Sequence, residues 1–193
     1  ALYKYLEKKT TTVILEGDGG DELFGGYDYN FLPHLVDKHK NKKILKIISD
    51  LFKFSKIKKK THDLQKEYFV NLCLTNSFQF GSTSDGTPFV NVDMFNKDYL
   101  NSAIDENFYL NFYKKIPNLK NNLKKSQFID MYFLKLQRAL KYKDRISMSY
   151  GIESRIPFLD HHFASYCFNL DNKFKIKNFE TRYLFKKLCK KFS

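Results

Sequence analysis

The feature that most constrains this chain is a β-branched, apolar run that leads directly into a glycine-rich acidic loop. The run covers residues 10–15, and residues 17–26 after it contain five glycines. An uninterrupted run of this kind is typical of a buried strand in a parallel sheet, because both faces of such a sheet are covered. Ligands of α/β proteins bind beyond the carboxyl ends of parallel strands. The pattern therefore predicts a binding site in this loop.

The loop carries four carboxylates within seven residues, at Glu16, Asp18, Asp21 and Glu22. Its glycines allow the backbone to adopt positive φ and to approach a ligand, and backbone N–H groups there can face an anion. Carboxylates repel phosphate oxygens unless a hard cation lies between them, and Mg²⁺ binds one or two carboxylates together with substrate oxygens. The loop therefore predicts a Mg²⁺–nucleotide site, with an acidic turn of no function as the alternative.

Spacing excludes two better-known loops. An EF-hand loop needs ligands at alternate positions and a Glu at position twelve. Asp18 and Asp21 are three residues apart, and position twelve counted from Asp18 is Tyr29. A Walker A loop needs Gly-Lys-Ser/Thr, which the sequence lacks.

Composition argues against several classes of protein. The chain has 34 basic and 21 acidic side chains and a net charge of +13, but only four of the basic residues are arginine. Because phosphate and base recognition depends on the guanidinium fork, we predict no nucleic-acid binding. The apolar runs are too short for a membrane span. Three cysteines, at positions 73, 167 and 189, form neither a metal pattern nor a disulfide framework and favour a reducing cytoplasm.

Most of the remaining sequence predicts helices and the turns between them. Residues 2–6 have the spacing of a helix end. Residues 31–71 form a basic helical segment with one apolar stripe, for which a helix lying on a membrane surface is the alternative. Residues 76–93 are rich in glycine, serine and proline and predict a loop.

The segment from residue 127 onward has the clearest helical pattern. Its apolar residues share one predicted face and are Ile129, Tyr132, Phe133, Leu136 and Leu140. Asp130 is expected to face away from them. Asp160 is expected to cap a following helix, and Thr181 to cap a last helix.

Two blocks of sequence resemble the asparagine synthetase family. The first is Gly-Asp-Gly-Gly-Asp-Glu at 17–22 followed by Phe-Gly-Gly-Tyr at 24–27, and it is similar to that family's second nucleotide-site motif. The second runs from Lys143 to His161 and is similar to the family signature Asp-Arg-x-Ser-Met…Glu-x-Arg-x-Pro-Phe-Leu-Asp. The order and separation of the blocks also fit. The resemblance covers residues 12–30 and 126–192.

The resemblance implies a fold and its division. The fold would be α/β, mostly helical, and the truncated C-terminal part of an adenine-nucleotide alpha-hydrolase-like (PP-loop ATP pyrophosphatase) domain. Residues 1–193 would form a single partial domain, with the strand and acidic loop in 1–30, a variable helical region in 31–125 and a helical signature region in 126–193. The family's Ser-Gly-Gly-x-Asp-Ser loop, glutaminase domain and a lysine-bearing loop are expected outside this sequence. We therefore expect these residues alone not to synthesise asparagine.

The resemblance also implies an activity. In this family ATP activates the side-chain carboxylate of aspartate as an acyl-adenylate, and ammonia attacks it to give asparagine and AMP. The ammonia comes from glutamine, through the glutaminase domain normally on the same chain. The implied cofactors are ATP and Mg²⁺, and a homodimer is one option. Two alternatives stay open: a relative that amidates another carboxylate, such as a surface sugar acid or a biosynthetic intermediate, and a non-catalytic binding module.

The family's site residues transfer to five positions. Asp18 resembles the catalytic carboxylate that assists formation of the intermediate and the attack of ammonia, and Asp21 resembles the Mg²⁺ ligand. Glu16 and Gly17 resemble the pair whose backbone touches the nucleotide, and Arg145 is a candidate for contact with its phosphates. Glu16 stands where the family often has Ser, and Asp18 is one methylene shorter than the usual Glu. Both departures leave the substrate open.

Two further groups in the second block have structural interpretations. Its acids and arginines are Asp144, Arg145, Glu153 and Arg155. We favour an ion-pair network over nucleotide contact for them, because charges this close together commonly pair. His161 and His162 are adjacent, so their side chains are expected to point apart and not to share a metal.

Overall fold

The computed structural model describes residues 2–39, 46–50, 52–53, 117–119 and 121–192. The chain divides into two compact units, one of residues 1–31 with 127–193 and the other of residues 32–126. Each unit is described by itself below. The assignment of residues 1–193 to a single partial domain stays a prediction.

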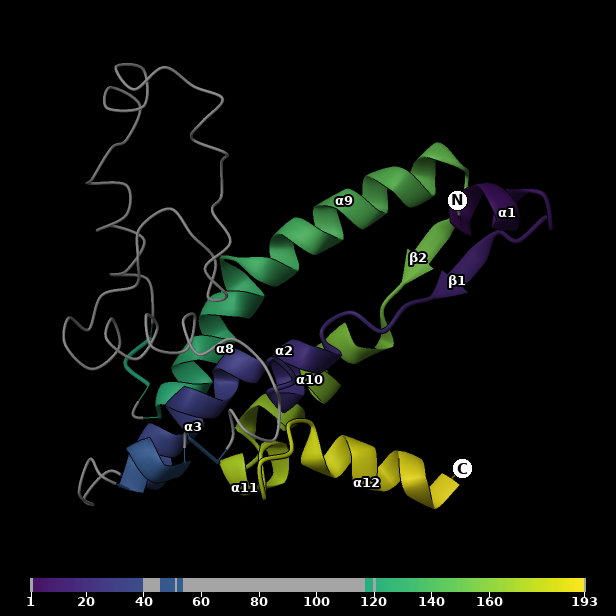
Figure 1. Cartoon of the computed structure of the whole chain (residues 1–193). Coiled ribbons are helices and arrows are strands. Elements are labelled where there is room, and N and C mark those ends of the chain that lie inside the picture. Colours follow the sequence, from purple (N-terminus) through teal and green to yellow (C-terminus); the bar gives the residue numbers. More distant parts are fainter. Residues whose placement is uncertain (1, 40–45, 51, 54–116, 120, 193) are drawn as a thin grey trace, which may run out of the picture. The chain divides into compact units, whose positions relative to one another are not determined.

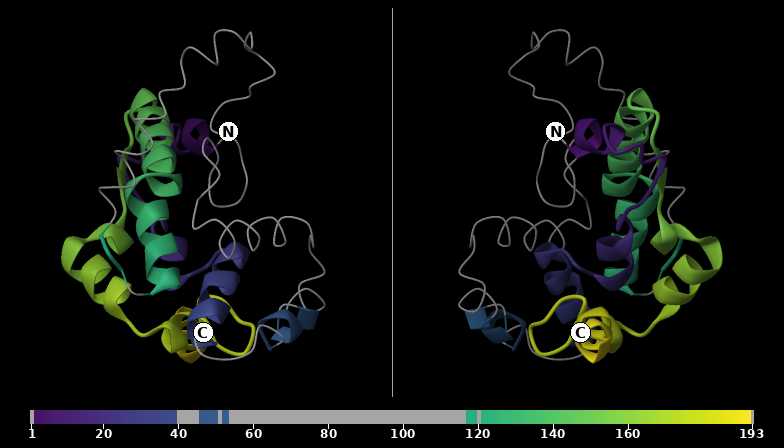
Figure 2. Two further views of the ribbon diagram at one scale, coloured as in Figure 1. Left: turned by 90° about the vertical axis from the view of Figure 1, so that its left-hand side faces the viewer. Right: turned by 90° about the vertical axis from the view of Figure 1, so that its right-hand side faces the viewer.

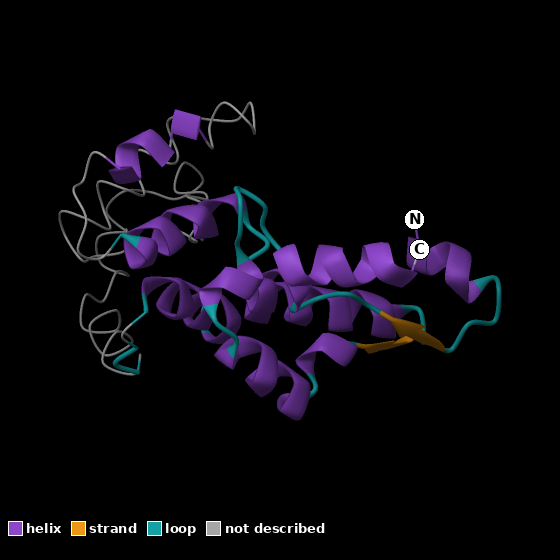
Figure 3. Cartoon of the chain, turned by 90° about the horizontal axis from the view of Figure 1, so that it is seen from below, coloured by secondary structure: helices purple, strands orange, loops and turns teal. Residues whose placement is uncertain are grey.

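The first unit is built on a small parallel sheet. Strand β1 (Val13–Leu15) pairs with β2 (Glu153–Arg155), and Val13 lies opposite Glu153 while Leu15 lies opposite Arg155. The two strands run side by side in Figures 1 and 3. The expected parallel strand is therefore confirmed over Val13–Leu15, but not over residues 10–12, where Thr10 has a positive φ of 56°. The strand joins the two motif-bearing blocks although 138 residues separate Leu15 from Glu153.

The expected burial of this strand is wrong for the described residues. The Val13 side chain is 40% exposed and that of Leu15 is 73% exposed. A parallel strand is buried when neighbouring strands and helices cover both of its faces. In the part of the chain that the structure describes, the sheet has two strands, so no third described strand pairs with either of them.

Helices make up most of the rest. They are α1 (Leu2–Glu7), α2 (Gly20–Phe24), α3 (Phe31–Lys38), α8 (Asn122–Tyr132), α9 (Lys135–Ser149), α10 (His161–Asn169), α11 (Asn172–Lys175) and α12 (Tyr183–Phe192), with short 3-10 turns η1 (Asp28–Asn30) and η4 (Pro157–Leu159). The end of α9 lies beside α1 in Figures 1 and 2, where the rings of Tyr3 and Tyr150 stack with centroids 6.5 Å apart. A mostly helical α/β architecture is thus confirmed.

Side-chain caps explain where two of these helices begin. The carboxylate of Asp160 accepts hydrogen bonds from the backbone N–H groups of His162 and Phe163 at 3.1 and 2.9 Å, which confirms the predicted cap of α10. The prediction for Thr181 is wrong. The first helical carbonyl of α12 is that of Arg182, which accepts from the Lys186 N–H at 2.9 Å, and Arg182 has a left-handed φ of 54°.

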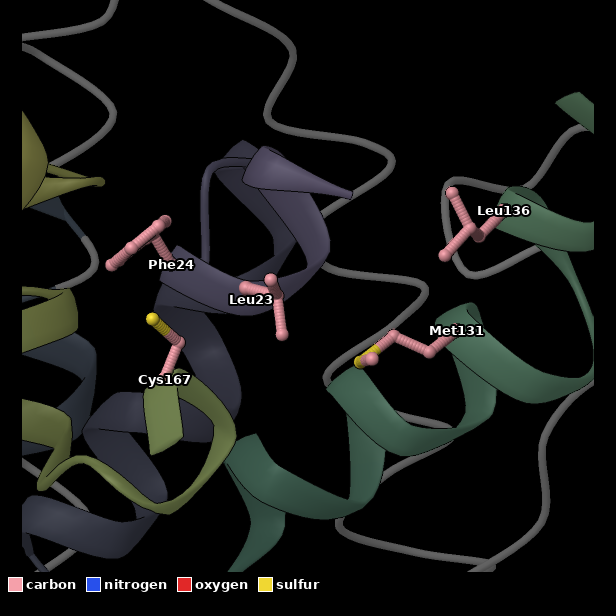
Figure 4. Close-up of a cluster of buried hydrophobic side chains, with 5 residues drawn as sticks. All are labelled: Leu23, Phe24, Met131, Leu136 and Cys167. Carbon is pink, nitrogen blue, oxygen red and sulfur yellow. The ribbon is translucent and has the colours of Figure 1, made fainter. Parts of the chain in front are cut away.

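The core of the first unit brings α2 against the later helices. Figure 4 shows its buried members, which are Leu23, Phe24, Met131, Leu136 and Cys167. Phe158, Phe163 and Phe185 surround the Phe24 ring, with centroids 5.6 to 6.4 Å from it. The acidic loop is thus anchored by its own apolar residues, Leu23 and Phe24.

The single helical face predicted from residue 127 onward is interrupted. Helix α8 ends at Tyr132 and α9 begins at Lys135, so the apolar residues before and after the break lie on two helices. Asp130 was expected to face away from the apolar residues and is instead fully buried. The hydroxyl of Tyr29 donates a hydrogen bond to its carboxylate at 2.9 Å. This partner lies 101 residues away, which no local periodicity can show.

The second unit is described in part. Asp37 accepts hydrogen bonds from the backbone N–H groups of Asn122 and Leu123, both at 2.9 Å, and so caps the start of α8. Nε2 of His39 lies 3.1 Å from the Asp50 carboxylate. Residues 46–50 and 52–53 are helical, as predicted, while the rest of 40–71 and the loop expected at 76–93 lie outside the described residues.

Truncating the core of the first unit is expected to destabilise it. Leu136 is 4% exposed, so Leu136→Ala should lower the free energy of unfolding by about 2–5 kcal/mol. Leu188, which is 46% exposed, provides the control, and Leu188→Ala should cost roughly 0.5 kcal/mol or less. Equal losses in urea denaturation of the two variants would contradict this core.

Candidate functional site

The acidic loop begins where β1 ends, beside the second signature block. The N–H of Glu16 donates to the carbonyl of Arg155 at 2.8 Å, which continues the strand pairing by one residue. Gly19 precedes α2 with a φ of 85°. A Cβ at Gly19 would overlap the side chain of Leu159 in η4, so only glycine lets the loop pack this closely on the second block.

A lysine from α9 joins two of the loop carboxylates. Nζ of Lys143 lies 2.7 Å from Oε2 of Glu16 and 2.5 Å from Oδ2 of Asp18. The hydroxyl of Tyr3 donates to the other carboxylate oxygen of Glu16 at 2.5 Å. Residues from α1, the loop and α9 therefore meet at one carboxylate pair.

This cluster changes the ionisation of its members. Burial alone would raise the pKa of Glu16, but hydrogen bonds from Lys143 and Tyr3 outweigh burial and lower the pKa to about 2. Burial likewise opposes the charge on Lys143, yet its bonds to Asp18 and Glu16 raise the pKa of the ammonium. The bond to Glu16 raises the pKa of Tyr3 to about 12. Glu16 is thus a stable anion and Lys143 a stable cation.

The next loop carboxylate, Asp21, faces a different cation. Nη1 of Arg182 lies 3.0 Å from Oδ1 of Asp21, just before α12. This oxygen is buried, and the guanidinium contact is not directed as a hydrogen bond. The Asp21 carboxylate also lies against Gly26, where any Cβ would overlap it.

Of the loop carboxylates, Asp21 alone is placed to serve as a protein ligand of a Mg²⁺ ion. The Asp21 side chain is 37% exposed, and because its Oδ1 is buried against Arg182, a metal ion would have to bind the other oxygen. Among the described residues, no group of three His, Cys, Asp or Glu side chains could hold a metal. Mg²⁺ characteristically takes one or two carboxylates and completes its shell with water and phosphate oxygens, so one carboxylate is compatible with a Mg²⁺–nucleotide site.

The surroundings of the fourth loop carboxylate, Glu22, indicate a structural role and not a binding role. It is buried, and the hydroxyl of Tyr27 donates to it at 2.6 Å. Burial raises the pKa of Glu22, and the bond from Tyr27 offsets part of the rise. The Tyr27 ring stacks on Tyr29 and carries the ammonium of Lys135 3.8 Å from its centroid.

The buried side-chain amide of Gln127 is hydrogen-bonded to the backbone of α2. Nε2 of Gln127 donates to the carbonyls of Glu22 and Leu23 at 2.5 and 2.9 Å. Its Oε1 accepts from Nζ of Lys175 at 2.9 Å, and the same ammonium donates to the Phe168 carbonyl at 2.9 Å. Gln127 and Lys175 are both fully buried, so this chain of bonds connects α8 and α11 with the site helix.

The structure brings together some predicted site residues and not others. Glu16 and Asp18 share Lys143, and Asp21 follows on the same loop. Gly17 has open space around the position of a Cβ. Arg145 is exposed on α9, where no ion pair or hydrogen bond to another described residue holds its side chain. Its contact with nucleotide phosphates stays a prediction.

The favoured ion-pair network of the second block is not formed among the described residues. Nε of Arg155 pairs with Oε1 of Glu153, two residues earlier, at 2.8 Å, and both side chains are exposed. Asp144, like Arg145, is exposed and outside this pair. The expectation that the two adjacent histidines point apart is also wrong, since the His161 and His162 rings lie 3.9 Å apart.

Three site residues escaped the sequence reasoning: Tyr3, Lys143 and Arg182. Lys143 directly precedes the Asp-Arg pair of the second block, and Arg182 is one of four arginines in a lysine-rich chain. These were the available signals. Tyr3 offered none, because its partner is set by the packing of α1.

Comparison with known proteins fits this geometry. The family model described as asparagine synthase matches residues 1–192, including the region 31–125 in which the two motifs are absent. The chain therefore belongs to the asparagine synthase family.

Among individual proteins, the chain is similar to asparagine synthetase [glutamine-hydrolyzing] 1 of Bacillus subtilis (strain 168). The two are 24% identical over 190 residues, which is 93% of this chain and 28% of that protein. The chain thus spans less than a third of the length of this relative. No solved structure matches the chain. In the part of the chain that the structure describes, no helix is both long enough and apolar enough to cross a membrane.

Gly17 and Gly19 provide a matched pair of positions at which the loop conformation can be tested. Gly19→Ala should lower the free energy of unfolding by about 1–3 kcal/mol, because φ is positive and the new methyl group meets Leu159. Gly17→Ala, which enters open space, should change it far less. Chemical denaturation of both variants measures this difference, and an equal or reversed order would refute the loop conformation.

Proposed function

We propose that this chain forms part of the Mg²⁺–ATP site of an amide ligase that makes asparagine from aspartate. Family membership supports the general reaction class. The observation that carries the proposal is the acidic loop itself. At the carboxyl end of β1, it holds Glu16 and Asp18 on one lysine and presents Asp21 beside them.

The proposed reaction has two steps. The side-chain carboxylate of aspartate attacks the α-phosphorus of ATP and releases pyrophosphate, which gives β-aspartyl-adenylate. Ammonia then attacks the activated carbonyl and AMP leaves, giving asparagine. Both steps move negative charge onto phosphoryl or acyl oxygens, so positioning and electrostatic stabilisation account for most of the catalysis.

Each loop residue has a role in this proposal. The backbone of Glu16 and Gly17 lies along the nucleotide, where the absence of a side chain at Gly17 leaves room for it. The Asp18 carboxylate, held by Lys143, faces the reacting groups and assists formation of the adenylate and the entry of ammonia. Arg145, exposed on α9, is the candidate for the phosphates.

Asp21 would hold the metal ion. When bound there, Mg²⁺ neutralises charge on the departing pyrophosphate. Arg182 keeps the Asp21 carboxylate in place from the other side and adds a second positive charge near the phosphates.

The wider assignments belong to the same proposal. The α/β unit would be part of a PP-loop ATP pyrophosphatase fold, to which its parallel strand pair and acidic loop correspond. A glutaminase domain would supply the ammonia, and the name of the Bacillus subtilis relative says that that protein hydrolyses glutamine. The free thiols of Cys167 and Cys189 support a reducing, cytoplasmic location. A homodimer remains part of the proposal without a described interface.

A second candidate acceptor is favoured by one observation. Glu16 and Asp18 differ from the residues common in the family, and Lys143 binds both of them. A carboxylate other than aspartate could therefore be the acceptor. Exchange of labelled pyrophosphate into ATP, measured in the protein with its natural flanking sequence, would distinguish the acceptors. Exchange that depends on L-aspartate supports asparagine synthesis, and exchange that depends on another acid supports the related ligase.

The nucleotide site itself is tested by binding. Asp21→Asn should weaken binding of Mg²⁺–ATP by about tenfold or more, because it removes a charged metal ligand. Glu180→Gln, at an exposed acid whose nearest cation is 3.9 Å away, should leave the affinity unchanged. Isothermal titration calorimetry in Mg²⁺ measures both. An unchanged affinity in the Asp21 variant would exclude Asp21 as the metal ligand.

A further inference from the structure

We propose that Lys143 is a positioning residue that fixes the carboxylate of Asp18 toward the reacting groups, with Glu16 as the second anchor of its ammonium. This inference rests on the proposed function and deepens it, because it makes the contact of Lys143 with Asp18 a requirement for the reaction. Lys143 would act on the reaction through Asp18 and make no contact with the nucleotide.

The Lys143 ammonium contacts the carboxylates of both Asp18 and Glu16. The ammonium lies 2.5 Å from Oδ2 of Asp18 and 2.7 Å from Oε2 of Glu16. The Glu16 side chain is held in turn by the hydroxyl of Tyr3. Residues of α1, the loop and α9 thereby fix the position of the ammonium, and the ammonium in turn orients the Asp18 carboxylate.

Burial makes this bridge necessary. The Glu16 and Asp18 side chains are 12% and 18% exposed, so water screens their mutual repulsion only weakly. The groups that face Glu16 are Tyr3 from α1, Asp18 from the loop and Lys143 from α9. Of these, Lys143 is the one cation. Without it, two partly buried carboxylates would repel each other, and Asp18 would turn toward solvent.

The position of Lys143 on α9 explains why this cation, and not Lys141 or Arg145, contacts the loop carboxylates. Lys141 lies two residues earlier on α9 and is exposed, so it points away from the loop. Arg145 lies two residues later and is also exposed. Lys143 is therefore the α9 cation that reaches the loop, and Lys141 is a matched control of the same type on the same helix.

The experiment compares Lys143→Met, Lys143→Arg and Lys141→Met in two measurements. The first follows the side-chain carboxyl ¹³C signals of Glu16 and Asp18 by NMR during a pH titration. Lys143→Met should move both signals and raise the pKa of Glu16 above about 2, because the ammonium, one of the groups that lower this pKa, is lost. Lys143→Arg should keep it low, and Lys141→Met should resemble the parent protein. An unchanged Glu16 titration in Lys143→Met overturns the proposal.

The second measurement separates positioning from direct contact, in the protein with its natural flanking sequence. Lys143→Met should lower kcat by about tenfold or more while KM for ATP changes little. The same substitution added to Asp18→Asn should cause no further loss, since Lys143 acts through Asp18. A raised KM for ATP, or a full additional loss in the double variant, would show direct contact and overturn the proposal. A parent protein without ligase activity would contradict the proposed function, while the NMR titration still decides whether Lys143 holds the two carboxylates.

Discussion

The repulsion between the carboxylates in the loop after β1 determines how the rest of this site is arranged. Four carboxylates in seven residues cannot share a partly buried loop without cations or protons. The protein supplies both from distant elements. Lys143 of α9 pairs with Glu16 and Asp18, Arg182 pairs with Asp21, and the Tyr27 hydroxyl donates to Glu22. The loop conformation is therefore a property of the folded first unit.

The same contacts explain why the two signature blocks belong together. Strand pairing fixes Glu16 beside Arg155, and the glycine at position 19 allows the loop to pack on Leu159. Behind the loop, the Gln127 amide holds the last carbonyls of α2 and is itself held by Lys175. A fully buried hydrogen-bonded chain of this kind leaves α2 little freedom to move. Asp18 and Asp21 consequently stand on a rigid support, which a site that positions phosphates requires.

Local patterns predicted the strand, its parallel direction, the loop after it and the Asp160 cap, because the residues that signal each of them lie close together in sequence. The partner strand, 138 residues further on, was not predicted from these patterns. Several of the failures arise from long-range contacts. The exposure of Leu15 depends on what lies beside the sheet, and the burial of Asp130 depends on Tyr29, 101 residues away. The cations at the site were missed for the same reason. The position of Lys143 directly before the Asp-Arg pair marks it as part of the second block, but it does not identify a partner 125 residues away.

The most direct test of the central claim, that the acidic loop binds a nucleotide with a divalent cation, replaces Mg²⁺ with paramagnetic Mn²⁺ and records the backbone amide signals by NMR. We expect Mn²⁺ with ATP to broaden the amide signals of residues 18–22 strongly. Those of α11 (Asn172–Lys175), on the far side of the buried amide chain, should broaden much less. Mn²⁺ without ATP should have a weaker effect at the loop, because one carboxylate alone binds the ion poorly. Uniform broadening, or broadening that spares the loop when ATP is present, would contradict the account.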